Sequence, residues 1–180
     1  MLDNDSNPDG DPLTVNTKPF ITPKNGTLDL NSDGSFTYTP NPSFVGTDSF
    51  TYQLSGGGLF SPFATVNITV NDLPTTSQVT LFEITEDSGT RRIGQARLLQ
   101  NASDIEGDPL VATGLKITSG NGTLVPDGPG FWLYTPAAND DTNVIFDYTI
   151  TDGTDSVTGI ATLDITPVND TPVVLSLIHI

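Results

Sequence analysis

The sequence predicts an all-β chain built from tandem antiparallel β-sandwiches. One reason is an internal repeat, because Asn25-Gly26-Thr27-Leu28 returns 96 positions later at 121–124. A second reason is that apolar and polar residues alternate along 148–166, as they do in half-buried strands. A third is that clusters of Gly, Asp, Asn and Pro divide the chain into segments of strand length.

The repeat also predicts the domain boundaries. The junction Asn71-Asp72 returns as Asn169-Asp170, and Ala64-Thr65 is matched by its sequence to 161–162. A repeat of this length fits a small sandwich domain of about 100 residues better than a solenoid unit of roughly 20 to 50. We therefore expect an N-terminally truncated repeat over 1–72, a complete repeat over 73–170, and a linker with a tail over 171–180.

Seven strands are expected in the complete repeat. Turn clusters such as Ser119-Gly120-Asn121-Gly122 separate them. The stretch 91–100 is also compatible with a short helical turn. Seven short strands in about 100 residues are typical of an immunoglobulin-like sandwich. The expected strands cover 78–85, 92–99, 109–118, 122–126, 130–135, 143–151 and 156–166.

The first repeat shows about the last five strands of this pattern, between Pro12 and Val70. A hairpin is expected over 29–38, with Asp33-Gly34 at its turn. The first repeat has no residues that match 78–99, so we expect its sandwich to lack one edge and to be marginally stable alone.

Aromatic residues recur at matching places in the two repeats. This recurrence favours a role in the core, where aromatic rings bury large areas. The alternative is a sugar-stacking platform centred on Trp132 and Tyr134. The matched residues are Phe36, Tyr38, Phe50 and Tyr52 in the first repeat, and Trp132, Tyr134, Phe146 and Tyr148 in the second.

The charge balance excludes several classes of partner. The chain carries 22 acidic and 6 basic residues, with a net charge of −16. Nucleic acid and anionic membranes both select positive surfaces, so neither is an expected partner. Without cysteine there are no disulfides, and the only histidine is His179, so a nucleophile–base pair is not expected and neither is an enzyme.

No signal peptide or membrane-spanning run is visible, so direct membrane insertion is not expected. The chain looks as if it was cut from a longer protein at both ends. Its last six residues, 175–180, fit neither repeat and resemble a translated sequencing adapter. We therefore expect a non-native tail there and give His179 no role.

Acidic residues are expected to gather at the two ends of the complete sandwich. Successive antiparallel strands alternate in direction, so the loops that hold Asp104, Asp108 and Asp152 should share the end near the incoming linker. Neighbouring carboxylates repel unless a cation joins them, and Ca²⁺ takes six to eight oxygen ligands. The alternative is that these residues only form turns, in which Asp and Asn are common. The candidate Ca²⁺ ligands at this junction are Asn71, Asp72, Asp104, Glu106, Asp108 and Asp152.

These motifs together resemble the cadherin-like tandem repeats of large bacterial secreted or surface adhesins. The resemblance rests on the loop 104–110, the Asn-Gly-Thr-Leu hairpins, the Tyr-Thr-Pro segments and the closing Asn-Asp-x-Pro. It implies a cadherin-like or immunoglobulin-like sandwich, with Ca²⁺ stiffening each junction. By position, it implies as ligands Asn71, Asp72, Asp104, Glu106, Asp108 and Asp152, with Glu86, Asn169 and Asp170 as their counterparts at the next junction.

The expected function is an extracellular or cell-surface stalk module that supports adhesion or biofilm formation. Its expected partners are neighbouring repeats of the same chain, with cell-surface or glycan targets beyond them. The alternative is a carbohydrate-binding or surface-binding sandwich that uses Trp132.

Overall fold

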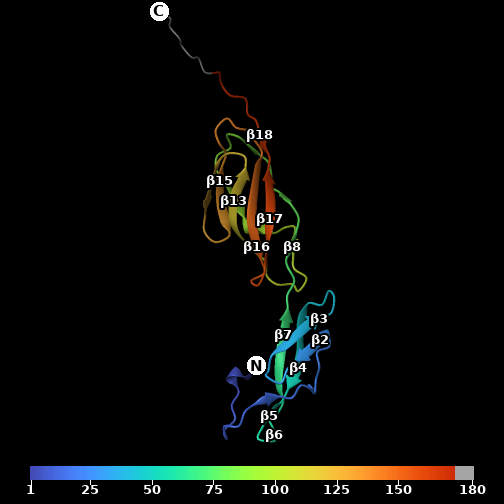
Figure 1. The fold of residues 1–180 in the computed structure, drawn as a ribbon. Coiled ribbons are helices and arrows are strands. Elements are labelled where there is room, and N and C mark those ends of the chain that lie inside the picture. The colour runs from blue at the N-terminus through green and yellow to red at the C-terminus, as the bar shows by residue number, and fades with distance from the viewer. Residues whose placement is uncertain (173–180) are drawn as a thin grey trace, which may run out of the picture. The chain divides into compact units, whose positions relative to one another are not determined.

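The computed structural model describes residues 1–172, which form two compact units, Met1–Asp72 and the unit that begins at Leu73 (Figure 1). The regular secondary structure of both units is almost entirely β-strand, and the strand pairs are mainly antiparallel. The prediction of all-β antiparallel sandwiches is therefore confirmed. The expected non-native tail, with His179, lies outside the described residues.

The second unit contains one short helix among its strands. Its elements in chain order are β8 (Thr75–Thr76), β9 (Val79–Thr80), β10 (Ile84–Thr85), β11 (Arg91–Gly94), α1 (Gln95–Leu98), β12 (Ala102–Ser103), β13 (Val111–Ser119), β14 (Thr123–Pro126), β15 (Phe131–Thr135), β16 (Val144–Thr151), β17 (Ser156–Leu163) and β18 (Ile165–Thr166).

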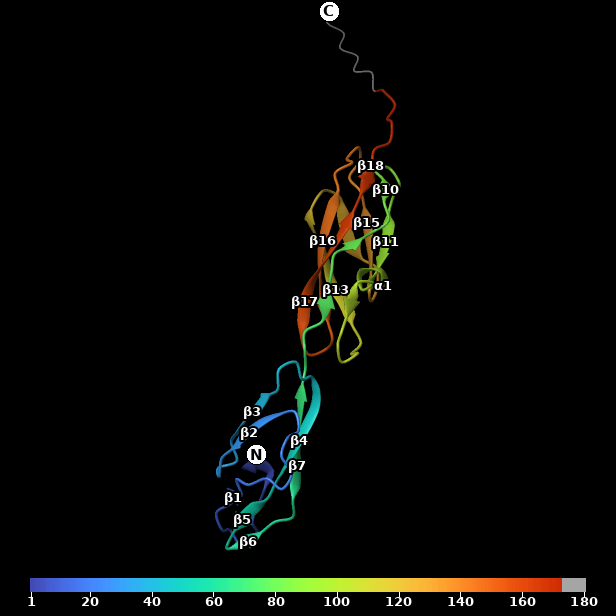
Figure 2. The ribbon, with the colours of Figure 1, turned by 90° about the vertical axis from the view of Figure 1, so that its right-hand side faces the viewer.

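Two sheets face each other across the core of this unit (Figure 2). One has the order β13-β16-β17-β9, and the other has the order β11-β15-β14. Two further pairs, β12 with β8 and β10 with β18, extend the sandwich toward its ends. Along β16, alternate residues from Val144 to Ile150 are buried, as the period-two pattern predicts.

The aromatic residues of the second unit belong to its core. Tyr134 and Phe146 are fully buried and meet edge to face, with ring centroids 5.4 Å apart. Tyr148 is also buried, and only 8% of Trp132 is exposed. A stacking platform needs an exposed ring face, so the alternative interpretation of Trp132 is wrong.

Two expected strands are interrupted. The stretch 78–85 forms β9 and β10, which pair in parallel with β17 and β18. Hydrogen bonds continue across the interruption, because the Leu81 N–H donates to the Thr162 carbonyl at 2.8 Å and the Ile84 N–H donates to the Asp164 carbonyl at 3.1 Å. The segment 79–85 therefore runs alongside β17 and then alongside β18, from β9 through to β10.

The expected strand 92–99 ends at Gly94, and α1 follows it. The short helix turns Leu98 into the core, where its side chain is fully buried. The Tyr148 hydroxyl donates a 2.7 Å hydrogen bond to the Leu98 carbonyl and holds the end of the helix. The sequence was compatible with either a strand or a short helical turn in this stretch, and burial of Leu98 favours the helical turn.

The first unit has a smaller core and pairs its strands in small groups. Its hairpin turns at Gly34, whose φ of +82° suits glycine in a tight turn. The predicted hairpin is confirmed. The elements are a short 3-10 helix (Leu2–Asn4), β1 (Thr14–Val15), β2 (Gly26–Leu30), β3 (Phe36–Pro40), β4 (Gly46–Tyr52), β5 (Leu54–Gly56), β6 (Leu59–Phe60) and β7 (Ala64–Val70), paired as β1-β5-β6, β2-β3 and β4-β7.

Strand register corrects one part of the repeat alignment. Phe50 pairs with Val66 in the first unit, and Phe146 pairs with Ala161 in the second. Val66 is therefore the structural counterpart of Ala161, whereas the sequence match had assigned Ala64. The two-residue offset leaves every side chain on its original face, so the alternation of the sequence could not reveal it.

Candidate functional site

The loop from Asp104 to Asp108 lies at the end of the second unit where the chain enters it. Strand β12 pairs with β8, which places Ser103 opposite Thr75. The Thr75 hydroxyl donates a 3.0 Å hydrogen bond to the Ser103 carbonyl. Pairing with β8 therefore holds the loop beside the first residues of the unit.

The Asp104 side chain folds this loop. Its Oδ1 accepts hydrogen bonds from the backbone N–H groups of Glu106 at 3.0 Å and Asp108 at 3.2 Å. Short Asp side chains commonly bond to backbone groups in this way. Glycine at position 107 has a φ of +82°, which lets the chain reverse between the two donors.

The other oxygen of Asp104 has a different environment. Oδ2 is buried and has no hydrogen-bond partner among residues 1–172. A buried polar atom without a partner is costly, and more so on a charged group. A hard cation such as Ca²⁺ takes carboxylate oxygens of this kind, so the chemistry of Asp104 fits that metal.

The loop that follows β16 lies at the same end of the sheet. Val111 at the start of β13 pairs with Thr151 at the end of β16, so the 104–110 and 152–155 loops leave the sheet together. Asp152 Oδ1 accepts 2.7 Å hydrogen bonds from the N–H groups of Thr154 and Asp155. The structure thus brings Asp104, Glu106, Asp108 and Asp152 to one end of the second unit.

Asn71 and Asp72 follow β7 directly and end the first unit. The Asn71 side-chain amide donates a 2.9 Å hydrogen bond to the Asp72 carbonyl. In the chain they immediately precede Leu73 and β8, the strand in which Thr75 pairs with Ser103.

The remaining candidates lie at the opposite end of the second unit. Only 7% of Glu86 is exposed, and its Oε1 accepts a 2.7 Å hydrogen bond from the Val168 N–H. The parallel pairing of β10 with β18 makes this contact possible. Glu86 therefore anchors the chain just before Asn169 and Asp170, which are both exposed.

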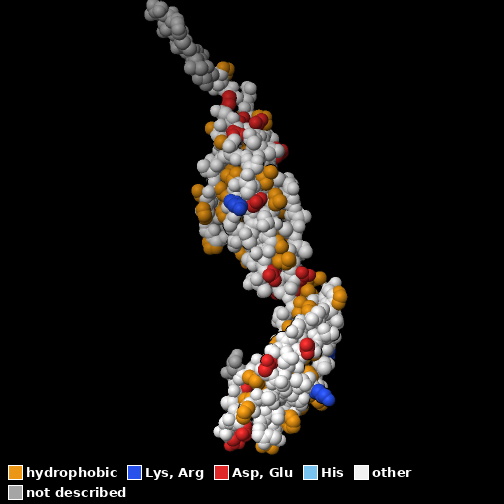
Figure 3. Space-filling model, in the orientation of Figure 1, with side chains coloured by type: hydrophobic (Ala, Val, Ile, Leu, Met, Phe, Trp, Pro, Cys, Tyr) orange, Lys and Arg blue, Asp and Glu red, His pale blue; other side chains and the backbone are white. Residues whose placement is uncertain are grey.

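Figure 3 shows acidic side chains at both ends of the second unit. Within residues 1–172, however, no group of three or more His, Asp or Glu side chains converges as a metal site would require. The candidates of the second unit therefore share its ends without converging, with Asp104 and Asp152 at the entry end and Glu86 at the opposite end.

Sequence reasoning missed Asp48, a residue that is only 6% exposed. It accepts hydrogen bonds from the N–H groups of Lys24 at 3.0 Å and Asn25 at 2.7 Å, and from the Tyr38 hydroxyl at 3.0 Å. Burial alone would raise the pKa of Asp48, but the hydrogen bonds from Lys24, Asn25, Ser49 and Tyr38 outweigh burial and lower the pKa to about 2. The sequence did hold a signal, because Asp48 lies two residues before Phe50 in β4. The period of two therefore places its side chain on the inward face.

Two family models of cadherin-like domains match the chain, one in each repeat. The model of the Cadherin-like domain matches residues 70–166, and the model of the Bacterial cadherin-like domain matches residues 1–72. No curated protein matches the chain. Among the described residues, no helix is long and apolar enough to cross a membrane.

Several solved structures are similar to the chain at low identity. An endo-fucoidan hydrolase of glycoside hydrolase family 107 is 23% identical with a TM-score of 0.34, over 89% of this chain and 24% of that one. Protocadherin gamma B2 domains 1–5 are 19% identical with a TM-score of 0.38, over 88% and 32%. Drosophila N-cadherin domains EC1–3 are 13% identical with a TM-score of 0.35, over 90% and 57%. The chain spans about a quarter of the hydrolase, and likenesses at this level carry no argument about activity.

Proposed function

The chain belongs to the family of cadherin-like domains, and on this premise we propose that it is a non-enzymatic spacer in the stalk of an extracellular adhesin. Its two units repeat one sandwich pattern, and an array of such units becomes longer with each repeat that is added. The partners in this proposal are neighbouring repeats of the same chain. A distant cell-surface or glycan target, including one in a biofilm, would be reached by the array as a whole.

Ca²⁺ stiffens the junctions of the array in this proposal. At the entry end of the second unit, the residues that would hold the ion are Asp104, Glu106, Asp108 and Asp152, together with Asn71 and Asp72. The single observation that supports this assignment best is the buried Asp104 Oδ2, which lacks a donor within residues 1–172. Glu86, Asn169 and Asp170 would act at the next junction.

The cation would do two things when bound. It would offset the repulsion between carboxylates that a net charge of −16 makes severe. It would also stabilise the folded units by mass action, because unfolded chain does not assemble the ligands. A linker without such an ion behaves as a flexible tether, which is poorly suited to a stalk.

Calorimetric titration of the full chain with Ca²⁺, alongside thermal melts with and without chelator, tests this proposal. We expect saturable binding and a melting temperature that rises with free Ca²⁺. Small-angle scattering of the same samples would show whether the ion also narrows the range of end-to-end dimensions that the chain adopts. No binding heat together with an unchanged melt would overturn the calcium assignment and leave the fold as described.

A further inference from the structure

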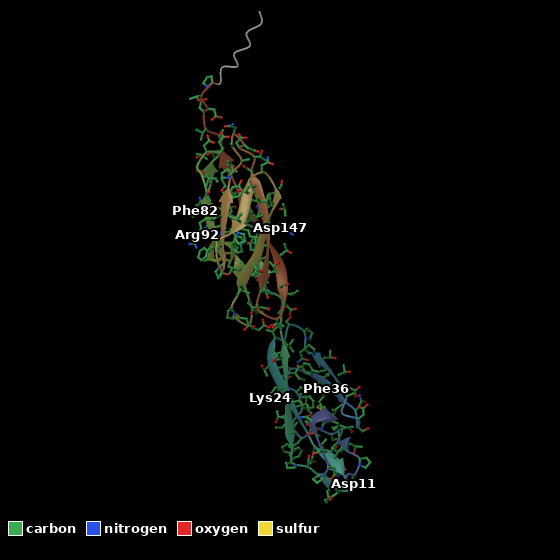
Figure 4. All side chains as sticks on the ribbon, turned by 90° about the vertical axis from the view of Figure 1, so that its left-hand side faces the viewer. Asp11, Lys24, Phe36, Phe82, Arg92 and Asp147 are labelled. Atoms are coloured by element: carbon green, nitrogen blue, oxygen red, sulfur yellow. The ribbon has the colours of Figure 1, made fainter. Side chains whose placement is uncertain are left out.

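The three arginines of the chain lie within one stretch of the second unit. Arg91 and Arg92 belong to β11, and Arg97 belongs to α1, which follows β11 directly. Figure 4 shows Arg92 on the same side of the second unit as Phe82, with Asp147 toward the other side. A chain with a net charge of −16 therefore holds a local surface of positive charge.

Phe82 is the apolar part of this surface. It lies between β9 and β10 and is 65% exposed. The guanidinium carbon of Arg97 lies 4.3 Å from the centre of the Phe82 ring, and that of Arg91 lies 6.0 Å from it. Both distances are within the range of cation–π attraction. One aromatic ring thus has two cations beside it and still offers much of its surface to solvent.

Neutral groups hold Arg97 in place. Its Nη2 donates a 2.6 Å hydrogen bond to the Thr80 carbonyl, and its Nη1 donates to the side-chain oxygen of Gln100. Each Nη carries a second N–H, so donors remain for a ligand. A side chain that is already held loses less conformational entropy when a ligand binds. Arg97 is therefore a preorganised cation.

An acidic partner neutralises only one of the three arginines. Arg92 forms an ion pair in which its Nε lies 2.6 Å from Asp127 Oδ2, and its guanidinium carbon lies 3.7 Å from the centre of the Phe131 ring. Arg91 and Arg97 form no ion pair with any residue in the described range 1–172. Their two charges are therefore available to an anionic ligand.

We propose that Arg91, Phe82 and Arg97 form a binding site for a carboxylated polysaccharide, a chain of uronic acid residues. The C–H face of one sugar would pack on the exposed part of the Phe82 ring, and neighbouring carboxylates would pair with the two guanidinium groups. Guanidinium groups form strong, charge-assisted hydrogen bonds with carboxylates. The site shares no residue with the candidate Ca²⁺ ligands, so it does not depend on the spacer role.

The charge of the whole chain favours a ligand with few charges. Any anionic ligand is repelled by the net charge of −16, and the repulsion grows with the charge that the ligand carries. Double-stranded DNA carries one charge per about 1.7 Å, which two arginines cannot offset. A polyuronate carries one carboxylate on each sugar, so charged groups and apolar C–H faces alternate along it. This alternation fits a surface that places two cations around one aromatic ring.

A pentamer of galacturonic acid is a suitable probe, added to the full chain in chelator and followed by NMR. The chelator prevents Ca²⁺ from bridging carboxylates of the pentamer to those of the protein. We expect saturable shifts of the amide signals of Phe82, Arg91 and Arg97, and weaker binding at high salt because exposed charges are screened. Binding should persist in Asp104→Asn, which separates this proposal from the calcium assignment.

Four variants locate the site. Arg91→Gln and Phe82→Ala change exposed or half-exposed side chains, and each should weaken binding by about fivefold. Glu83→Gln removes the exposed acid that follows Phe82 and should tighten binding. Lys116→Gln removes one positive charge from an exposed position of β13, on the other sheet, so it is the matched control and should change affinity by less than about twofold.

Three results would overturn the proposal. One is the absence of shifts near Phe82 at about 5 mM pentamer, a concentration that detects millimolar affinity. Another is equal weakening by Arg91→Gln and Lys116→Gln, because binding would then follow net charge alone. The third concerns the ligand and needs no variant of the chain to fold. A methyl-esterified pentamer, which lacks the charges, or a sulfated galactose pentamer should bind more weakly, and equal binding of either would exclude the carboxylates as the recognised groups.

Discussion

The hydroxyl of Tyr38 donates a 3.0 Å hydrogen bond to the buried carboxylate of Asp48. In the second unit, Tyr134 at the matching position donates instead to the Asn121 carbonyl at 2.6 Å, and Val144 stands where the first unit has Asp48. The two units therefore use different acceptors for the same tyrosine. The first unit depends on an ionised carboxylate in a place where the second depends on packing.

The first prediction concerns acid stability. The pKa of Asp48 is lowered to about 2, because hydrogen bonds from backbone amides and Tyr38 outweigh the effect of burial. A carboxyl whose folded pKa lies below its unfolded value of about 3.9 adds stability above that unfolded value, and the contribution is lost as pH falls toward 2. Between these pH values, we expect the melting temperature of the first unit to fall more steeply with decreasing pH in the native chain than in the Asp48→Asn variant. Parallel curves for the two proteins would contradict this role.

The second prediction tests the assignment of Trp132 to the core. Trp132→Ala should destabilise the second unit by about 3–5 kcal/mol, as truncation of a buried large aromatic residue does. Trp132→Phe should restore most of that stability because it refills much of the volume. Denaturant melts followed by circular dichroism measure both. A Trp132→Ala protein of native stability would show that the ring is not part of the core.

The third prediction concerns the hydrogen bond from Tyr148 to α1. Tyr148→Phe should cost about 1–3 kcal/mol, because the Leu98 carbonyl would remain buried without its 2.7 Å donor. Amide exchange in α1 should accelerate more than exchange at the distant end of β16. Equal acceleration throughout the unit would mean that the bond does not act locally on the helix.

The fourth prediction uses Gly159, which packs under the Tyr148 ring. A Cβ at this position would overlap a ring carbon of Tyr148. Gly159→Ala should therefore destabilise the second unit by about 1–3 kcal/mol through overpacking. Thr158→Ala, at an exposed neighbouring position, should change stability by less than about 0.5 kcal/mol. Urea melts of both variants give the comparison, and a neutral Gly159→Ala would contradict the close contact.

The fifth prediction separates Ca²⁺ binding from turn formation at Asp104. Asp104→Asn keeps an oxygen that can accept from Glu106 and Asp108, yet removes the charge that a cation needs. We expect Ca²⁺ affinity to fall by about tenfold or more, equal to about 1.4 kcal/mol, with little change in the melt in chelator. Asp164→Asn makes the same change of charge in the same unit and serves as the matched control. Equal affinity in the two variants would exclude Asp104 as a ligand.

Much of the fold follows from local pattern. Alternation along β16 identifies Phe146, Tyr148 and Ile150 as inward-facing, because successive side chains of a strand point to opposite faces. The Asp33-Gly34 turn likewise predicts its hairpin, since the strands on either side are adjacent in sequence. The loops of Asp104 and Asp152 could be placed at one end of the sandwich by counting strand reversals.

Contacts between distant parts of the chain required the tertiary structure. The pairing of Phe50 with Val66 could not be read from the alternation, because a two-residue slip leaves the facing pattern intact. The environment of Asp48 depends on backbone groups 23 and 24 residues away, which no local pattern identifies.

By itself, the sequence determined the long strands of the second unit, such as β16, and which of their side chains face inward, because both depend on a period of two residues. Only the tertiary structure decided the register, the interruption of the first strand, and the buried positions of Trp132, Asp48 and Asp104 Oδ2. Those features arise where segments far apart in the chain meet. There, the need to fill volume and to satisfy buried polar atoms selects among arrangements that local patterns allow equally.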